Sequence, residues 1–94
     1  MSPKDCRLFN AALENYVSCI CRKYGALFKN VACAIENFSL SLFEYALEGI
    51  DSYLKIEGAL AIFNSNYNFI DTHLAERYKI ALAKKCPNHF APQT

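Results

Sequence analysis

The residues from 26 to 48 are the most apolar stretch of the chain, and they constrain its fold more than any other segment. At about 3.6 residues per helical turn, the polar side chains of this stretch fall on one narrow stripe. The stripe consists of Asn30, Cys33, Asn37, Ser41, Glu44 and Glu48. A surface helix needs an apolar arc of only about 100°, so a helix that is apolar over most of its circumference is expected to be central. In a chain of 94 residues few other helices are available to cover it, which makes a second chain a natural candidate.

Helical periodicity continues along the rest of the chain, and no alternating strand pattern competes with it. The predicted helices span residues 3–24, 26–48, 51–64 and 68–85. We therefore expect an all-α fold, a small bundle of four helices, or of five if the second helix divides. Residues 1–86 are predicted to form a single bundle domain, and residues 87–94, which contain two prolines and no periodic pattern, a flexible C-terminal tail. A chain of this size can bury a stable core without metals or disulfides.

Capping residues set the boundaries of these helices. Gly25 and Gly49 are predicted to end the first two helices, because glycine readily adopts the left-handed conformation of a C-terminal cap. Asp51 or Ser52 is expected to cap the third helix. Gly58 lies inside the third helix, where it costs about 1 kcal/mol relative to alanine but allows another helix to approach closely.

The second predicted helix also contains an internal start signal. Ser41-Leu42-Phe43-Glu44 matches a capping box, and Leu40 and Tyr45 are placed as a hydrophobic staple around it. If this signal is used, the stretch divides into two helices. We expect the helix to remain undivided.

Apolar residues are more numerous than one small core needs. They make up 53% of the chain, whereas charged residues make up 20%, somewhat below the usual share of about 25%. The residues expected to be inaccessible in the core are Leu13, Ile20, Val31, Ile35, Leu42, Leu74 and Tyr78. Other large apolar side chains project from more than one side of the later helices. The candidate interface residues are Phe38, Phe43, Tyr45, Tyr53, Leu54, Phe63 and Ile80.

The charge balance does not suggest a nucleic-acid partner. Ten Lys and Arg against nine Asp and Glu give a formal net charge of +1. Nucleic-acid binding usually requires a basic surplus or stripe. The two basic pairs, Arg22-Lys23 and Lys84-Lys85, both fall at predicted helix ends, where they complement the helix dipole. No nucleic-acid partner is therefore expected, and a DNA-binding regulator is a less favoured interpretation.

No stretch reaches the ~20 apolar residues that a transmembrane helix requires, because Lys29, Glu36, Glu44 and Glu48 interrupt the longest one. The N-terminal residues lack the cationic start and apolar run of a signal peptide. We therefore expect no membrane span and a cytoplasmic, reducing location.

The cysteines number five, which excludes a framework in which all of them pair within one chain. Four lie in predicted helices among apolar residues, where a free Cys behaves as a small hydrophobe, so we expect reduced thiols. The alternative is a secreted protein with one unpaired thiol. An alternative interpretation is a zinc site that joins Cys19, Cys21, Cys86 and His89. Two residues apart on a helix, Cys19 and Cys21 point about 200° away from one another and do not reach one ion. No metal and no cofactor are expected.

No arrangement of residues predicts catalysis. The two histidines, His73 and His89, lie in no local motif that would activate a thiolate. Glu44 and Glu48 share one helix face with Glu36 nearby, and such a row is more often a solvated face than an acid–base pair. The glycines form no phosphate-binding loop. We expect no enzymatic activity.

The sequence favours a non-enzymatic helical module for protein–protein interaction, an adaptor, regulatory or accessory protein that self-associates as a homodimer. The chain has six Tyr and seven Phe, and aromatic residues are favoured at interface cores. The second or third predicted helix is expected at the centre of the dimer. The alternative is a bundle that encloses an apolar ligand, such as a lipid or a cofactor tail, with the same side chains lining a cavity.

Overall fold

Helices are the only regular elements in residues 7–14 and 16–87, the parts of the chain that the computed structural model describes, and this confirms the all-α prediction. They are α1 (Arg7–Ala12), α2 (Ser18–Glu36), α3 (Leu40–Leu47), α4 (Tyr53–Ser65), the short 3-10 helix η1 (Tyr67–Phe69) and α5 (Thr72–Lys85). The described residues therefore follow the version of the prediction in which the second helix divides.

The predicted first helix, residues 3–24, is wrong in its extent. The helix ends at Ala12, and α2 begins only at Ser18, after Val17 has adopted an extended conformation. Gly25 is not a stop, since it lies inside α2 next to a kink at Tyr24. The physical reason is tertiary. Because the chain breaks between α1 and α2, α1 folds back against α2 and α4. The ring of Phe9 packs on the core as a result.

The undivided helix over residues 26–48 is also wrong. α2 ends at Glu36, and Phe38 takes a left-handed conformation with φ of 53°, which stops the helix. α3 then starts from Ser39, whose hydroxyl oxygen accepts a hydrogen bond from the backbone N–H of Leu42 at 3.2 Å. The cap therefore lies two residues before the predicted capping box at Ser41.

The later boundaries are closer to the prediction. Ser52 caps α4, with its hydroxyl oxygen accepting from the N–H of Lys55. α5 starts at Thr72 instead of residue 68, because Asp71 is its N-cap and accepts hydrogen bonds from the N–H groups of His73 and Leu74. The turn η1 occupies the residues in between.

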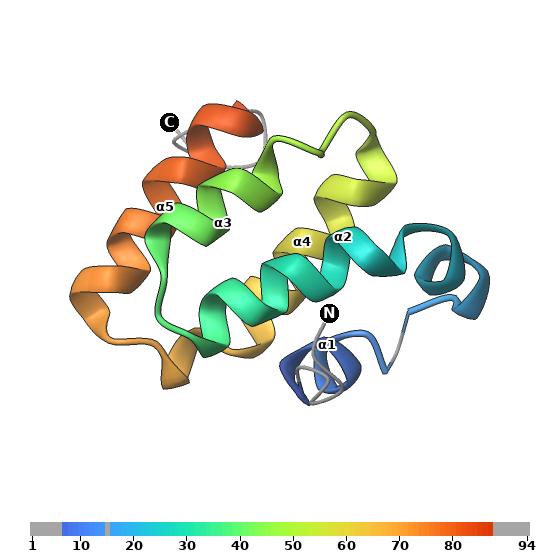
Figure 1. Cartoon of the computed structure of the whole chain (residues 1–94), viewed down its shortest axis with the longest axis horizontal. Coiled ribbons are helices and arrows are strands. Elements are labelled where there is room, and N and C mark those ends of the chain that lie inside the picture. The colour runs from blue at the N-terminus through green and yellow to red at the C-terminus, as the bar shows by residue number, and fades with distance from the viewer. Residues whose placement is uncertain (1–6, 15, 88–94) are drawn as a thin grey trace, which may run out of the picture.

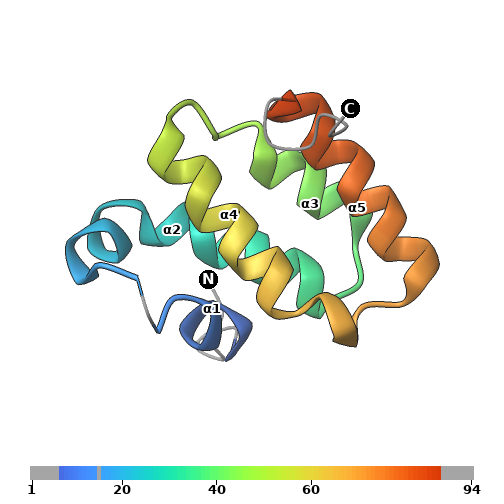
Figure 2. The ribbon, with the colours of Figure 1, turned by 180° about the vertical axis from the view of Figure 1, so that it is seen from behind.

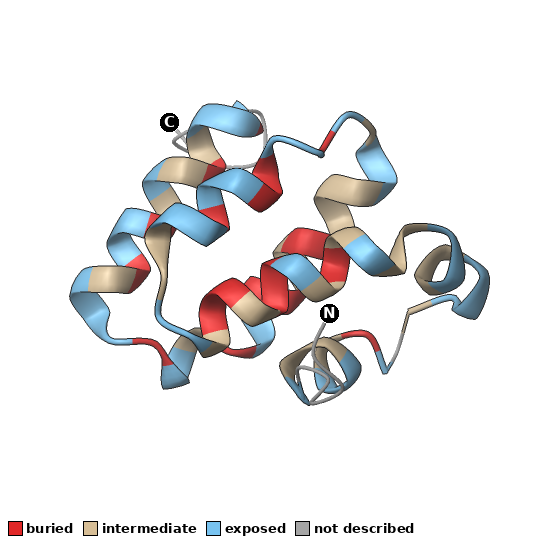
Figure 3. Ribbon diagram, viewed as in Figure 1, coloured by how far each residue is buried: buried red, intermediate tan, exposed pale blue. Residues whose placement is uncertain are grey.

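The helices are arranged around the pair α2 and α4, which lie against one another in the middle of the molecule (Figures 1 and 2). α3 and α5 lie side by side on one flank, and α1 packs on the other, against α2 and α4. The buried residues face the space between these helices, whereas the outer sides of α3 and α5 are exposed (Figure 3).

Aromatic rings fill the centre of the core. Phe43 and Tyr78 stack with their ring centroids 4.2 Å apart, and the ring of Phe63 meets Tyr78 edge-on. The hydroxyl of Tyr78 donates a hydrogen bond to the carbonyl oxygen of Ala34 at 3.1 Å. These contacts join α2, α3, α4 and α5, so the core extends across the boundary between the central pair and the α3–α5 flank.

Most of the expected core residues are buried. Leu13, Val31, Ile35 and Tyr78 are inaccessible as predicted, whereas Ile20 and Leu74 are half-buried. The prediction for Leu42 is wrong, since this side chain is 48% exposed. The close approach expected at Gly58 is confirmed, because a Cβ atom there would overlap the ring of Phe28.

Candidate protein-interaction surface

Large apolar side chains are exposed at several places on the described surface. They are Val17, Phe38, Leu42, Tyr45, Tyr53, Leu54, Phe69 and Ile80. Single exposed apolar residues are normal, whereas neighbouring ones that form a contiguous patch indicate an interaction site. The question is therefore which of these residues the fold brings together.

The structure separates the predicted interface residues into two groups. Five are at the surface: Phe38, Tyr45, Tyr53, Leu54 and Ile80. The other two, Phe43 and Phe63, are corrected to core residues, because their rings pack against Tyr78 and are excluded from solvent.

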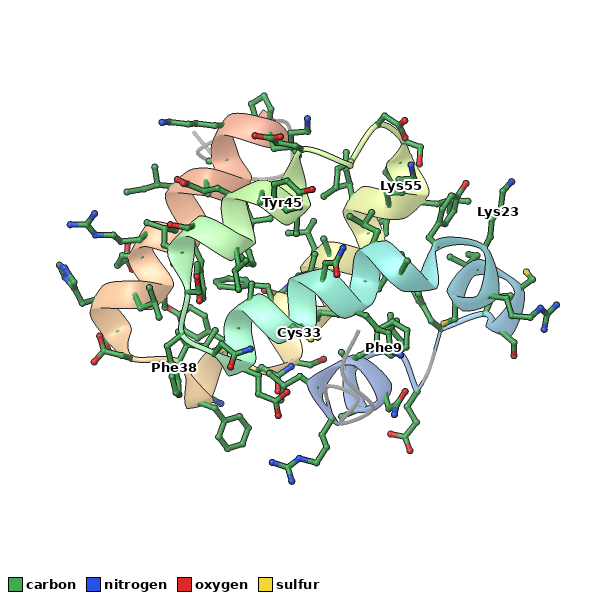
Figure 4. The ribbon with its side chains drawn as sticks, viewed as in Figure 1. Phe9, Lys23, Cys33, Phe38, Tyr45 and Lys55 are labelled. Atoms are coloured by element: carbon green, nitrogen blue, oxygen red, sulfur yellow. The ribbon has the colours of Figure 1, made fainter. Side chains whose placement is uncertain are left out.

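The outer side of α3 divides into an acidic and an apolar edge. Its inner side carries the buried residues Phe43, Ala46 and Leu47. Glu44 and Glu48 border a shallow depression between α3 and α5, whereas Tyr45 borders a second depression, on the side of α2. Tyr45 is 69% exposed, and Leu42 lies three residues before it, on the same side of the helix. Figure 4 shows Tyr45 on the outer side of α3 and Phe38 at the turn that precedes this helix.

The outer side of α5 carries cations around an apolar side chain. Ala75, Tyr78 and Leu82 are buried against the bundle, so the residues between them face outward. These are Arg77, Ile80 and Lys84, which follow one another at spacings of three and four and therefore form one row. Ile80 is 58% exposed.

We define the α3–α5 face as the exposed residues Leu42, Glu44, Tyr45 and Glu48 of α3 together with Arg77, Ile80 and Lys84 of α5. The two helices run in the same direction. Phe43 stacks on Tyr78, and further along, Glu48 borders the same depression as Lys84. A residue of α3 is therefore level with the residue of α5 that comes about 35 positions later in the chain.

The ion pairs between described residues lie away from the α3–α5 face. They join Lys55 to Asp51 at 2.8 Å, Arg7 to Glu36 at 3.8 Å and Lys79 to Glu76 at 3.8 Å. Within the described ranges, neither Glu48 nor Lys84 takes part in an ion pair.

Sequence patterns predict only part of this face. They place Leu42 in the core and relate Lys84 to the helix dipole. Leu42 and Tyr45 are three residues apart and share one side of any helix, but that this side faces outward follows from the break before α3, which the sequence prediction lacks.

Among the four cysteines that the structure describes, one differs from the reduced expectation. Cys33 is disulfide-bonded, whereas Cys19, Cys21 and Cys86 are free thiols. Cys86 is buried at the end of α5 and donates a hydrogen bond from its thiol to the carbonyl oxygen of Leu82. Burial raises the pKa of this thiol, which keeps it protonated.

The described residues do not assemble the alternative zinc site. No group of three or more His, Cys, Asp or Glu side chains suited to a metal ion occurs in residues 7–14 and 16–87. Cys19 is exposed on α2 and Cys86 is buried at the end of α5. The fourth predicted ligand, His89, lies outside the described residues.

The histidine and acidic side chains considered for catalysis are spread over α2, α3 and α5. His73 is exposed in the first turn of α5, and Glu36 pairs with Arg7 at the end of α2. Glu44 and Glu48 are exposed on α3. These two acidic side chains belong to the charged edge of the α3–α5 face.

None of the helices in the described part of the chain has the length and apolar character that crossing a bilayer requires. Comparisons with protein-family models, with curated proteins and with solved structures found no match.

Proposed function

We propose that the chain is a non-enzymatic module for protein–protein interaction that associates with itself. One observation carries this proposal: the adjacent helices α3 and α5 expose Leu42, Tyr45 and Ile80 to solvent, whereas the rings of Phe43 and Tyr78 stack in the core between them. Apolar side chains that the core does not need are stabilised by contact with another chain.

The alternative function, enclosure of an apolar ligand, is less well supported. A ligand cavity at the centre of the bundle would have to displace the rings of Phe43, Phe63 and Tyr78, which contact one another there. The depressions beside α3 are open to solvent, and a drug-sized ligand is usually buried over most of its surface.

The cytoplasmic, reducing location that the sequence favours stays a prediction. The disulfide at Cys33 argues against it, because disulfides persist mainly in oxidising compartments.

Molar mass in solution tests the proposed function. We expect size-exclusion chromatography with light scattering to give a mass that rises with concentration toward twice the 10.6 kDa of one chain. A mass of 10.6 kDa that stays constant up to high micromolar concentration would overturn self-association. Native mass spectrometry of the same sample would detect a co-purified apolar ligand, which would favour the alternative function.

A further inference from the structure

We propose that the α3–α5 face pairs with the same face of a second copy, around a two-fold axis that runs along these two helices. This inference rests on the proposed self-association and adds to it the surface and the arrangement of the two copies. Two-fold pairing of identical patches is the commonest form of homo-oligomer.

Because α3 and α5 run in the same direction, a two-fold axis along them determines which residues of the two copies face one another. When the axis lies between the two helices and parallel to them, α3 of each copy lies over α5 of the other at the same level. Phe43 is level with Tyr78 within one chain. Tyr45 therefore faces the partner's Ile80, and Glu48 faces the partner's Lys84.

Charge selects this arrangement over the other face-to-face arrangement. An axis perpendicular to the helices would stack each helix antiparallel on its own copy. Glu44 would then oppose the partner's Glu48, and Arg77 would oppose the partner's Lys84. Like charges held opposite one another are destabilising, whereas the axis along the helices matches each acidic edge with a basic row.

The exposed apolar side chains of the face and its charges also favour this pairing. Tyr45 and Ile80 are 69% and 58% exposed, so both have most of their surface free for a partner. In the described part of the chain, Glu48 and Lys84 form no ion pair that would have to be broken first. Two helices of 8 and 14 residues offer an interface at the small end of the range, so we expect a dissociation constant on the order of micromolar.

Exchanging the two charges between different chains tests this pairing. In Glu48→Lys alone, the introduced lysine of each chain would face the partner's Lys84. In Lys84→Glu alone, the introduced glutamate of each chain would face the partner's Glu48. We expect either variant to dimerise roughly tenfold more weakly than the wild type.

An equimolar mixture of the two variants restores the attraction, because both cross-chain pairs of the mixed dimer are again opposite in sign. With one variant labelled with ¹⁵N, native mass spectrometry should show mixed dimers well above the statistical share.

Two exposed charges outside the α3–α5 face serve as the matched control. The mixture of Glu14→Lys with Lys23→Glu should form mixed dimers only at the statistical share, with wild-type affinity. Circular dichroism should show unchanged helicity for all four variants, because every substituted side chain is exposed.

The outcomes separate this inference from the proposed function. A wild-type chain that dimerises, together with a statistical mixture of Glu48→Lys and Lys84→Glu, would overturn the pairing and leave self-association intact. A wild-type chain that stays monomeric would overturn the proposed function itself. A chain carrying both substitutions that recovers dimerisation, when the mixture does not, would mean that the two charges act only within one chain, and this also overturns the pairing.

Discussion

The ring of Phe28 sets the crossing of α2 and α4. It is fully buried and lies directly over Gly58, with the rings of Phe9, Tyr16 and Tyr24 around it. The absence of a side chain at Gly58 is therefore a packing requirement, and its cost to helix propensity is offset by the burial of a whole aromatic ring.

Gly58→Ala is expected to lower the free energy of unfolding by about 1–3 kcal/mol, because the added methyl group overpacks against an enclosed ring. Gly25→Ala is the matched control. A Cβ at this position would lie 3.9 Å from the nearest side-chain atom, of Phe9, so the substitution should stabilise α2 by roughly 0.5–1 kcal/mol. Urea unfolding of both variants measures the difference. Equal effects of the two substitutions would contradict the close approach at Gly58.

Tyr78 is a polar residue that the core tolerates because its hydroxyl is hydrogen-bonded. The side chain is inaccessible, and the hydroxyl donates to the carbonyl oxygen of Ala34. The N–H of Ser39 also donates to that oxygen, so removing the hydroxyl leaves no unsatisfied carbonyl. Burial raises the pKa of Tyr78 to about 12, because the phenolate would have to form without water.

Tyr78→Phe should therefore cost about 1 kcal/mol at neutral pH, the net contribution of one hydrogen bond. The wild-type advantage is present below the unfolded-state pKa of about 10 and is lost as the pH rises toward about 12, since the unfolded chain releases its proton first. Unfolding midpoints in urea, measured at neutral pH and at several values above pH 10, should converge and then cross, because the high pKa of the buried phenol costs the wild type more at about pH 11–12 than the ~1 kcal/mol of the hydrogen bond. A difference in unfolding midpoint between the wild type and Tyr78→Phe that is the same at neutral pH and above pH 10 would contradict the raised pKa.

Among the elements, α3 shows how a break in the backbone changes which side chains of a periodic apolar pattern face the core. Ile35 and Leu42 are seven residues apart and would share one face of an undivided helix. Phe38 interrupts the helix between them. The direction in which each side chain of α3 points is therefore set by the new helix start at Ser39 and no longer follows from α2. Ile35 is buried and Leu42 is exposed as a result.

The cap at Ser39 gives a direct test of this start. Ser39→Ala should destabilise the protein by about 1 kcal/mol, because the N–H of Leu42 loses its acceptor. Ser41→Ala, at the position where the sequence pattern places the cap, is the control and should change stability by less than about 0.5 kcal/mol. Thermal and urea unfolding would report both values. If Ser41→Ala lowers the free energy of unfolding more than Ser39→Ala does, the cap is at Ser41, as the capping-box pattern predicts.

Helix boundaries are predictable where they depend on local chemistry. Ser52 caps α4 as expected, because a hydroxyl oxygen near the first N–H groups suffices. The breaks after Ala12 and at Phe38 do not follow from such rules. The break after Ala12 lets the ring of Phe9 reach that of Phe28, a contact between residues far apart in the chain. Single-sequence patterns contain no information on that contact.

At the scale of the whole molecule, the candidate interface is predictable in composition but only partly in position. Two of the predicted interface residues, Tyr45 and Ile80, are exposed in the structure. Residue type alone does not distinguish Phe43 and Phe63 from them. Their burial depends on where Tyr78 lies, and α5 is separated from α3 by more than twenty residues of sequence.

The state of Cys33 likewise depends on the whole fold and does not follow from its neighbours in the chain. Both a reduced and a bonded form fit a cysteine on α2 with apolar neighbours, and the choice depends on which other chain segment folds against the helix. A disulfide stabilises mainly by restricting the unfolded chain, so it acts on the whole molecule.

Cys33→Ser is therefore expected to lower the free energy of unfolding by about 2–4 kcal/mol, the usual contribution of a disulfide. Cys19→Ser replaces an exposed free thiol and should change it by less than about 0.5 kcal/mol. A reductant should lower the thermal midpoint of the wild type and of Cys19→Ser but leave that of Cys33→Ser unchanged, because this variant has no bond at position 33 to reduce. Differential scanning calorimetry of the three proteins, with and without reductant, measures these midpoints. If the reductant shifts none of them, Cys33 is a free thiol in solution, and the reducing location that the sequence favours regains its support.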